Sequence, residues 1–304
     1  MPKTSKPCVF ISPFRYPGGK RTFIPFITDM IHASGPCKMF VEPFAGGAAV
    51  SIGLLESGVT ENIILNDAFG PIADFWHTVF SEDAMALSER VAACFPTIEQ
   101  WYDISAQPLT DDAAENAFRV LFLNRTSFSG VVNKRAGPIG GRLQTSIYGV
   151  ACRWNGARLA SRILELSKLR DRVSWVGDGG WEKVSAAVVR ECTARGLDAE
   201  YAFWYLDPPY FRKANKIYGA WFKPEEHRRL HGFLTSDMAP RHWVLSYDLV
   251  PEAKDMWGEH LGYSEDKFST FYVMRRDRTK EHMVKRSEIV VLSENLLTCI
   301  DNRI

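Results

Sequence analysis

The sequence predicts an α/β protein whose mostly parallel sheet is interrupted, after its second strand, by a mostly helical insertion. Two observations lead to this prediction. Short apolar runs that end in acidic residues alternate with helical patterns on both sides of 81–170. Within 81–170 the strand pattern disappears and helical periodicity replaces it. We therefore assign 1–80 and 171–304 to the sheet-forming domain and 81–170 to an inserted domain.

The composition is that of an ordinary globular protein. The chain has 304 residues, of which 46% are hydrophobic, enough for a sizeable core. It has no run of eighteen apolar residues, and its start lacks the pattern of a secretory signal, so we expect a cytoplasmic location. Six scattered cysteines form no C-x-x-C pair, which argues against a disulfide framework and against a zinc site.

The net charge of +1 gives no support by itself for a nucleic-acid partner. The charges are unevenly distributed, however. Basic residues cluster at 134–142, 212–223 and 275–286, whereas acids dominate 56–115. A surface charged on one side can bind phosphates, although clusters of this kind are more often solvated faces.

The segment 15–20 is a turn with two glycines that opens into an amphipathic helix. Gly18 and Gly19 allow the backbone to approach a ligand closely, and Lys20 offers that ligand a charge. The alternative interpretation is an ordinary loop followed by a core helix.

A second glycine turn, 43–49, separates a short strand at 38–42 from a helix that ends near Ser57. A strand, a glycine turn and a helix in succession can bind a nucleotide, but the glycine turn can also be an ordinary connection between the strand and the helix. The next strand, 62–67, ends in Asp67 about twenty residues later, where a carboxylate can bind ribose hydroxyls. Asp67 could equally cap the helix that follows.

The inserted domain combines helices with a long loop. Helical periodicity covers 83–95, 111–123 and 154–169, with Asn155 as a cap of the last helix. The loop 124–142 mixes Arg, Lys and Asn with the apolar Val131 and Val132. This mixture suits a hairpin that grips phosphates, reads base edges and wedges between bases, whereas the alternative is an unspecialised surface loop.

The strand pattern returns after the insertion. We expect strands at 173–176, which Asp178 follows, at 203–208 and at 242–248, and a closing hairpin formed by 268–274 and 287–293 around charged residues. The strand at 203–208 stops in Asp207-Pro208-Pro209-Tyr210. Proline cannot extend a sheet ladder, so Asp207 should lie at the carboxyl end of a buried strand, facing a ligand.

Four predicted strands therefore end in site-like residues, namely Glu42 with its glycines, Asp67, Asp178 and Asp207. If these strands are parallel, all four ends meet along one edge of the sheet and form one crevice.

In this order of motifs the chain resembles the DNA adenine N6-methyltransferases of the Dam-like group, the D12 class. The resemblance implies a Rossmann-like S-adenosylmethionine-dependent methyltransferase sheet with an inserted target-recognition domain. It implies that the cofactor is bound by Tyr16, Lys20, Glu42, Phe44, Gly46, Asp67, Asp178 and Asp207. It implies a catalytic motif formed by Asp207, Pro208, Pro209 and Tyr210. Ala48 departs from the family, in which many members have glycine at this position.

The resemblance also implies a reaction and a partner. Asp207 and the carbonyl of Pro208 would accept the two hydrogens of an adenine amine, Tyr210 would stack on the flipped base, and no metal would be needed. The partner would be double-stranded DNA of a prokaryotic or phage-infected cell, with no membrane involved, and a cognate restriction endonuclease is compatible with this. The DNA-contacting residues would be Asn124, Arg125, Asn133, Lys134, Arg135 and Arg142. The alternatives are an RNA or cytosine-N4 amino methyltransferase and a catalytically silent DNA-binding protein.

Overall fold

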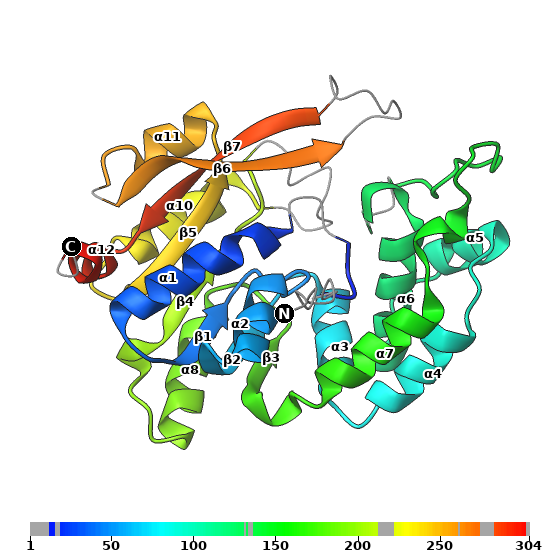
Figure 1. The fold of residues 1–304 in the computed structure, drawn as a ribbon, viewed down its shortest axis with the longest axis horizontal. Helices are drawn as coiled ribbons and strands as arrows, with labels where there is room; N and C mark the ends of the chain where they lie inside the picture. The colour runs from blue at the N-terminus through cyan, green and yellow to red at the C-terminus, as the bar shows by residue number, and fades with distance from the viewer. Residues whose placement is uncertain are drawn as a thin grey trace, which may run out of the picture.

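A computed structural model describes residues 12–15, 19–130, 132, 136–211, 222–260, 262–273 and 283–301, with the backbone alone for 263–273 and 283–287. Over these residues the chain forms one seven-stranded sheet in the order β3-β2-β1-β4-β5-β7-β6 (Figure 1). The strands are β1 (Cys37–Glu42), β2 (Thr60–Asn66), β3 (Val173–Gly177), β4 (Phe203–Leu206), β5 (His242–Asp248), β6 (Tyr263–Val273) and β7 (Met283–Leu292).

The first five strands are parallel, and only β7 runs antiparallel to its neighbours β5 and β6. Their carboxyl ends therefore meet at one edge of the sheet, as predicted. The strand order reverses between β1 and β4, because the chain moves outward from β1 to β2 and β3 and then returns to β4. The connections after β1 and β4 diverge at this switch point, where open α/β sheets bind ligands.

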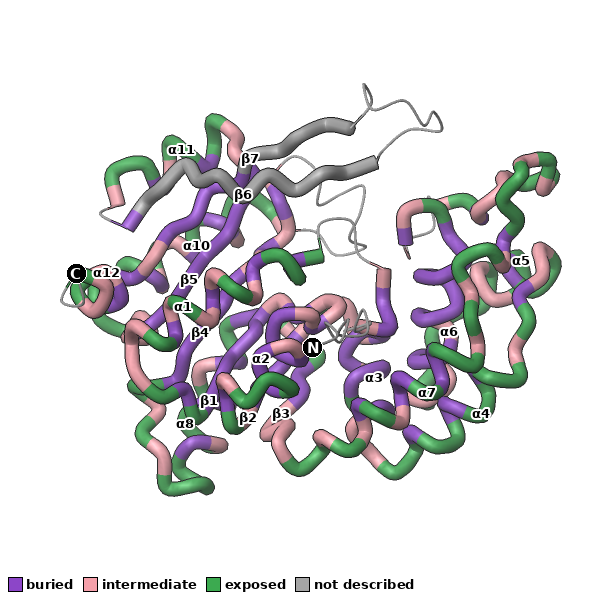
Figure 2. Tube along the Cα trace, viewed as in Figure 1, coloured by how far each residue is buried: buried purple, intermediate pink, exposed green. Residues whose placement is uncertain are grey.

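Helices cover both faces of the sheet. One face carries α1 (Ile24–Ser34), α2 (Ala49–Ser57), α3 (Gly70–Val79) and α12 (Glu294–Asp301), and the other carries α8 (Lys183–Ala194), α10 (Pro224–Leu234) and α11 (Pro251–Trp257). Successive strand residues alternate between the two layers. On β4, Phe203 and Tyr205 pack in the first core, whereas Trp204 and Leu206 pack in the second. Figure 2 shows that the central strands are mostly buried, and their buried residues belong to both cores.

The segment predicted to be an insertion lies between β2 and β3 in the chain and is helical. Its helices, beside α3, are α4 (Ala84–Ala93), α5 (Ile98–Ala106), α6 (Ala113–Thr126) and α7 (Gly156–Ser167) (Figure 1). The helices α4, α6 and α7 were predicted, and Asn155 caps α7 by accepting the Arg158 amide. The helix α5 was not predicted. Its start carries a capping box, in which Thr97 and Gln100 bond each other's backbone amides.

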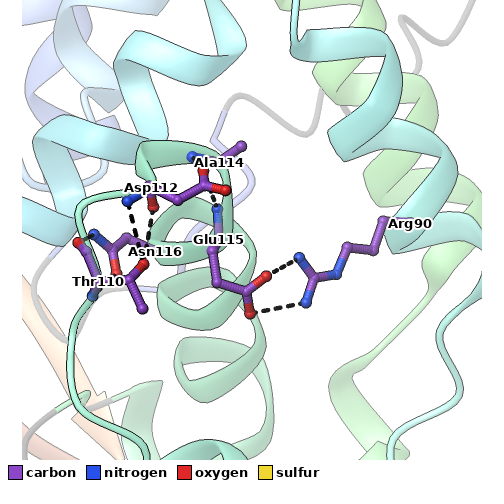
Figure 3. A network of polar contacts seen from close by, with 6 residues as sticks. All are labelled: Arg90, Thr110, Asp112, Ala114, Glu115 and Asn116. Carbon is purple, nitrogen blue, oxygen red and sulfur yellow. Dashed lines mark hydrogen bonds and ion pairs between the residues drawn. The ribbon is translucent and has the colours of Figure 1, made fainter.

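A polar network orients the start of α6 within the insertion (Figure 3). Asp112 caps the helix by accepting the amides of Ala114 and Glu115 at 2.8 and 3.1 Å. Glu115 in turn forms a two-pronged ion pair with Arg90 of α4. The pair is partly exposed, so it adds little to stability and mainly orients α6 relative to α4.

Three predicted boundaries were wrong. The strand predicted at 203–208 ends at Leu206, so Asp207 and Pro208 follow it. The helix α6 continues through Thr126, so Asn124 and Arg125 belong to its last turn and not to the loop. The closing hairpin is longer than predicted, because β7 begins at Met283 within the segment predicted to form its turn. The described cysteines are all free thiols, and no helix in the described part of the chain has the length and apolar character needed to cross a membrane.

Candidate active site

The glycine turn after β1 is held in place by backbone hydrogen bonds. The Ala45 amide donates to the Asn66 carbonyl at 2.8 Å, which ties the end of β1 to the end of β2. Trp76 of α3 donates its indole N–H to the Gly46 carbonyl at 2.9 Å. Ala48 has a left-handed backbone with φ 47°. Glycine adopts this conformation without strain, so alanine here costs about 1 kcal/mol.

Asp67 closes the turn from the β2 side. Its carboxylate accepts the Gly46 amide at 2.8 Å and the Phe69 amide at 2.9 Å. Burial raises the pKa of Asp67 to about 6, and these two hydrogen bonds oppose the rise. The carboxylate is therefore fixed beside the glycine turn, and its role in binding a ribose stays a prediction.

Glu42 ends β1 beneath the same turn. Its Oε2 accepts both the backbone amide and the hydroxyl of Ser51, at 3.2 and 2.5 Å. Ser51 lies in the first turn of α2, so Glu42 serves as the cap that Ala48 cannot provide. Burial raises the pKa of Glu42 to about 8 despite these bonds, and the charges of Asp207 and Asp67 add to the rise.

Asp207 follows β4 and is held through one of its oxygens. Oδ1 lies 3.2 Å from Nζ of Lys20 and accepts the Ser246 hydroxyl at 3.1 Å. Burial raises the pKa of Asp207 to about 6, while Lys20 opposes the rise and Glu288 adds to it. At neutral pH the carboxylate is therefore ionised and can only accept hydrogen bonds.

Tyr210, at the end of the same motif, is buried. Its hydroxyl accepts a hydrogen bond from Lys20 at 2.5 Å and donates one to Oε1 of Glu288 at 3.0 Å. The ammonium of Lys20 lies 5.1 Å from the centre of the Tyr210 ring. Lys20 thus joins the first glycine segment to both ends of the Asp-Pro-Pro-Tyr motif.

These elements line one cavity of about 260 Å³ at the carboxyl edge of the sheet. It brings together the predicted residues Lys20, Glu42, Phe44, Gly46, Asp67, Asp207 and Pro209. Gly130 and Val132 of the insertion also reach it, as does Phe14. Asp178 is exposed and is not among the lining residues, and Gly179 and Gly180 lie at the cavity in its place.

Of the residues predicted to contact DNA, the structure describes Asn124, Arg125 and Arg142. Asn124 is 1% exposed, and its amide bonds the backbone of Arg15 and Gly130. Arg125 is 6% exposed and donates to the Pro13 carbonyl. Both were expected to contact DNA, but the structure places them inside, where they anchor the segment 12–15. Arg142 is exposed. The other predicted site residues, Tyr16, Asn133, Lys134 and Arg135, lie outside the described residues.

The base of the predicted recognition hairpin is described. Ser127 and Pro138 form an antiparallel bridge, with hydrogen bonds from Phe128 to Gly137 and from Ile139 to Thr126. The chain therefore leaves α6 and returns beside it, as a hairpin requires.

Several arginines lie close together near the base of the predicted hairpin. Burial and the neighbouring Arg153 lower the pKa of Arg15. Burial, Arg15 and Arg158 lower the pKa of Arg125 to about 9. Within the described part of the chain, Nη1 of Arg15 is buried and has no hydrogen-bond partner. Mutually repelling guanidinium groups of this kind favour an anion between them.

Sequence reasoning missed several residues of the site, above all Glu288, Ser246 and the cavity-lining pair Trp181 and Phe222. For Glu288 a signal was present. It is an acid directly before the apolar run 289–292, in a strand expected to be buried.

The strand order and the cavity at the switch point define a Rossmann-like methyltransferase fold. Within this class, residues 16–137 match the model of a particular family, the D12 class N6 adenine-specific DNA methyltransferases. The match confirms the resemblance predicted from the motifs. It spans both glycine segments and Asp67 and ends before Asp207. The family supports DNA adenine methylation as the general activity, and its members are generally S-adenosylmethionine-dependent. No curated protein matches the chain.

Proposed function

We propose that the protein is a site-specific DNA adenine N6-methyltransferase that uses S-adenosylmethionine and acts on an adenine flipped out of the duplex. The observation that carries this proposal is the position of Asp207. It opens into the same cavity as the glycine turn and Asp67, and its Oδ1 is already fixed by Lys20 and Ser246.

The cavity residues fit the proposed cofactor. Asp67 and Asp207 line the cavity with carboxylates, and a cation nearby favours the ionisation of Glu42, so the three acids suit a cationic sulfonium. We assign Asp67 to binding the ribose hydroxyls of the cofactor. Phe44 and Gly46 would line the walls of the cofactor pocket, and Glu42 would lie near the positively charged end of the cofactor. The indole N–H of Trp181, which also lines the cavity, is buried without a hydrogen-bond partner among the described residues and is available to an acceptor. When bound, the cofactor supplies an electrophilic methyl group.

The chain itself prepares the amine. Because Oδ1 of Asp207 is engaged, we assign Oδ2 and the Pro208 carbonyl to the two amine hydrogens. Acceptors fixed in advance stabilise the positive charge that develops on nitrogen during transfer. They also direct the lone pair of the amine nitrogen into the cavity, which aligns the amine with the methyl group that it attacks. Stacking of the base on Tyr210 stays a prediction, because Lys20 and Glu288 already hold its hydroxyl.

The insertion would supply the DNA contacts. Gly130 and Val132 of the insertion lie at the cavity, and the exposed Arg142 offers charge to phosphates. We further propose that the protein acts on the DNA of a prokaryotic or phage-infected cell. Protection of that DNA from a restriction endonuclease would reveal a cognate partner.

The direct test is transfer of a labelled methyl group to plasmid DNA, followed by digestion to nucleosides and mass spectrometry. The expected product is N6-methyladenine. Asp207→Ala should abolish it while cofactor binding, measured by calorimetry, persists. N4-methylcytosine, label in RNA alone, or wild-type transfer by Asp207→Ala would contradict the proposal.

A further inference from the structure

Glu288 is a buried acid on the antiparallel strand β7, in the predicted closing hairpin but outside every predicted site motif. Its Cα pairs with that of Asp248 on β5, one strand beyond β4. Its side chain is 2% exposed. Burying a carboxylate is costly unless it is paired and hydrogen-bonded, so its partners indicate its role.

Both carboxylate oxygens of Glu288 have partners in the catalytic region. Oε1 accepts the Tyr210 hydroxyl at 3.0 Å, and Oε2 accepts the Lys20 ammonium at 2.7 Å. Because Lys20 also donates to Tyr210 at 2.5 Å, the three side chains form a closed triangle. Each position in the triangle is therefore determined by the other two.

The triangle also determines where Asp207 lies. Lys20 is the vertex that reaches Oδ1 of Asp207, at 3.2 Å. Without Glu288, the ammonium would shift toward Asp207 or Asp248, and the Tyr210 hydroxyl would lose this acceptor. The geometry of the segment 207–210 would then be less strictly determined, because the contacts of Glu288 with Lys20 and Tyr210 are lost.

We propose that Glu288 is a positioning residue that sets the geometry of the Asp-Pro-Pro-Tyr motif, with one oxygen acting through Lys20 on Asp207 and the other acting directly on Tyr210. Its kinetic consequences rest on the proposed function, whereas its effect on the order of 207–210 does not. A merely stabilising ion pair would lower the melting temperature and leave the folded enzyme fully active.

The test compares Glu288→Gln, which keeps the size, and Glu288→Asp, which keeps the charge but shortens the reach. Exposed Glu294, at the start of α12, provides the matched control Glu294→Gln. Two readouts are needed. One is single-turnover methyl transfer at saturating S-adenosylmethionine, together with the KM for that cofactor. The other is hydrogen exchange of the Asp207 and Tyr210 amides in the protein alone.

Glu288→Gln should slow transfer by about ten- to a hundredfold while KM changes less than about threefold, because alignment is lost and binding is kept. Exchange of both amides should quicken, and Glu288→Asp should recover part of each effect. Combined with Tyr210→Phe, the losses should be less than additive, since both changes break one triangle. The control should behave as wild type.

Unchanged exchange, or an unchanged transfer rate in folded Glu288→Gln, would overturn the proposal. Fully additive losses would overturn the link through Tyr210. If the wild-type protein transfers no methyl group to DNA, the proposed function fails, and the exchange measurement alone decides the role of Glu288.

Discussion

Nζ of Lys20 lies 3.2 Å from Oδ1 of Asp207, so the residue that follows the first glycine segment meets the acid that ends β4. Lys20 was predicted to offer its charge to a ligand. It lines the cavity, but its ammonium is engaged by Asp207, Glu288 and the Tyr210 hydroxyl. Its contribution to a cationic cofactor would therefore be indirect, because it keeps Asp207 ionised and in place.

The pH dependence of transfer should follow the ionisation of Asp207. Its pKa is raised to about 6 by burial, and only the ionised form accepts both from Lys20 and from an amine. Single-turnover rates should therefore fall as the pH is lowered through about 6. Lys20→Met removes the cation that opposes this rise in pKa, so its acidic limb should move to higher pH. An acidic limb that does not move in this variant would contradict the assignment.

Cofactor affinity should depend on the charge of Glu42. Its pKa is about 8, so at pH 7 it is mostly protonated, and a cation nearby favours its ionisation. The ratio of affinities for S-adenosylmethionine over neutral S-adenosylhomocysteine should rise by up to about tenfold from pH 7 to 9. Calorimetry at several pH values measures this ratio. In Glu42→Gln the ratio should not change with pH. A ratio that does not change with pH in the wild-type protein would contradict the role of Glu42.

The role of Asn124 as an anchor can be separated from DNA binding. Its amide makes three hydrogen bonds to the backbone of Arg15 and Gly130 while buried. Asn124→Ala should lower the free energy of unfolding by about 2–4 kcal/mol in urea titrations, because buried backbone groups lose their partners. Exposed Arg142→Ala is the control and should stay within about 0.5 kcal/mol. Equal stability of the two variants would restore the prediction that Asn124 contacts DNA.

The tip of the recognition hairpin remains a prediction from the sequence. Replacing Lys134 and Arg135 together by Ala should weaken DNA binding and reduce the slope of affinity against salt by up to about two, one for each phosphate contact. Fluorescence anisotropy between low and moderate salt measures this slope. A slope equal to that of the wild-type protein would show that these side chains do not contact phosphate.

The sheet and the cavity were predictable because their signals are local. Apolar runs that stop at Glu42, Asp67 and Asp207 mark strand ends, and parallel pairing brings such ends together without further information. Ala48, which has a left-handed backbone, occupies the position where many family members have glycine. This strained position was therefore also marked in the sequence.

The errors and omissions depend on contacts between distant parts of the chain. Asn124 and Arg125 are polar and were expected outside, but the segment 12–15 covers them. Glu288 acquires its role from Lys20 and Tyr210, which local periodicity cannot pair with it. The missed helix α5 has a single buried residue, Trp101, so its periodic signal is weak.

The central claim is that the cavity at Asp207 methylates adenine N6 in DNA. Modification-sensitive sequencing of DNA from cells that express the protein tests it most directly, because it reports the base, the atom and the sequence context together. We predict N6-methyladenine at one defined sequence, absent when Asp207→Ala is expressed at the same level. Adenines left unmodified by the wild-type protein, or modification that persists in Asp207→Ala, would contradict the claim.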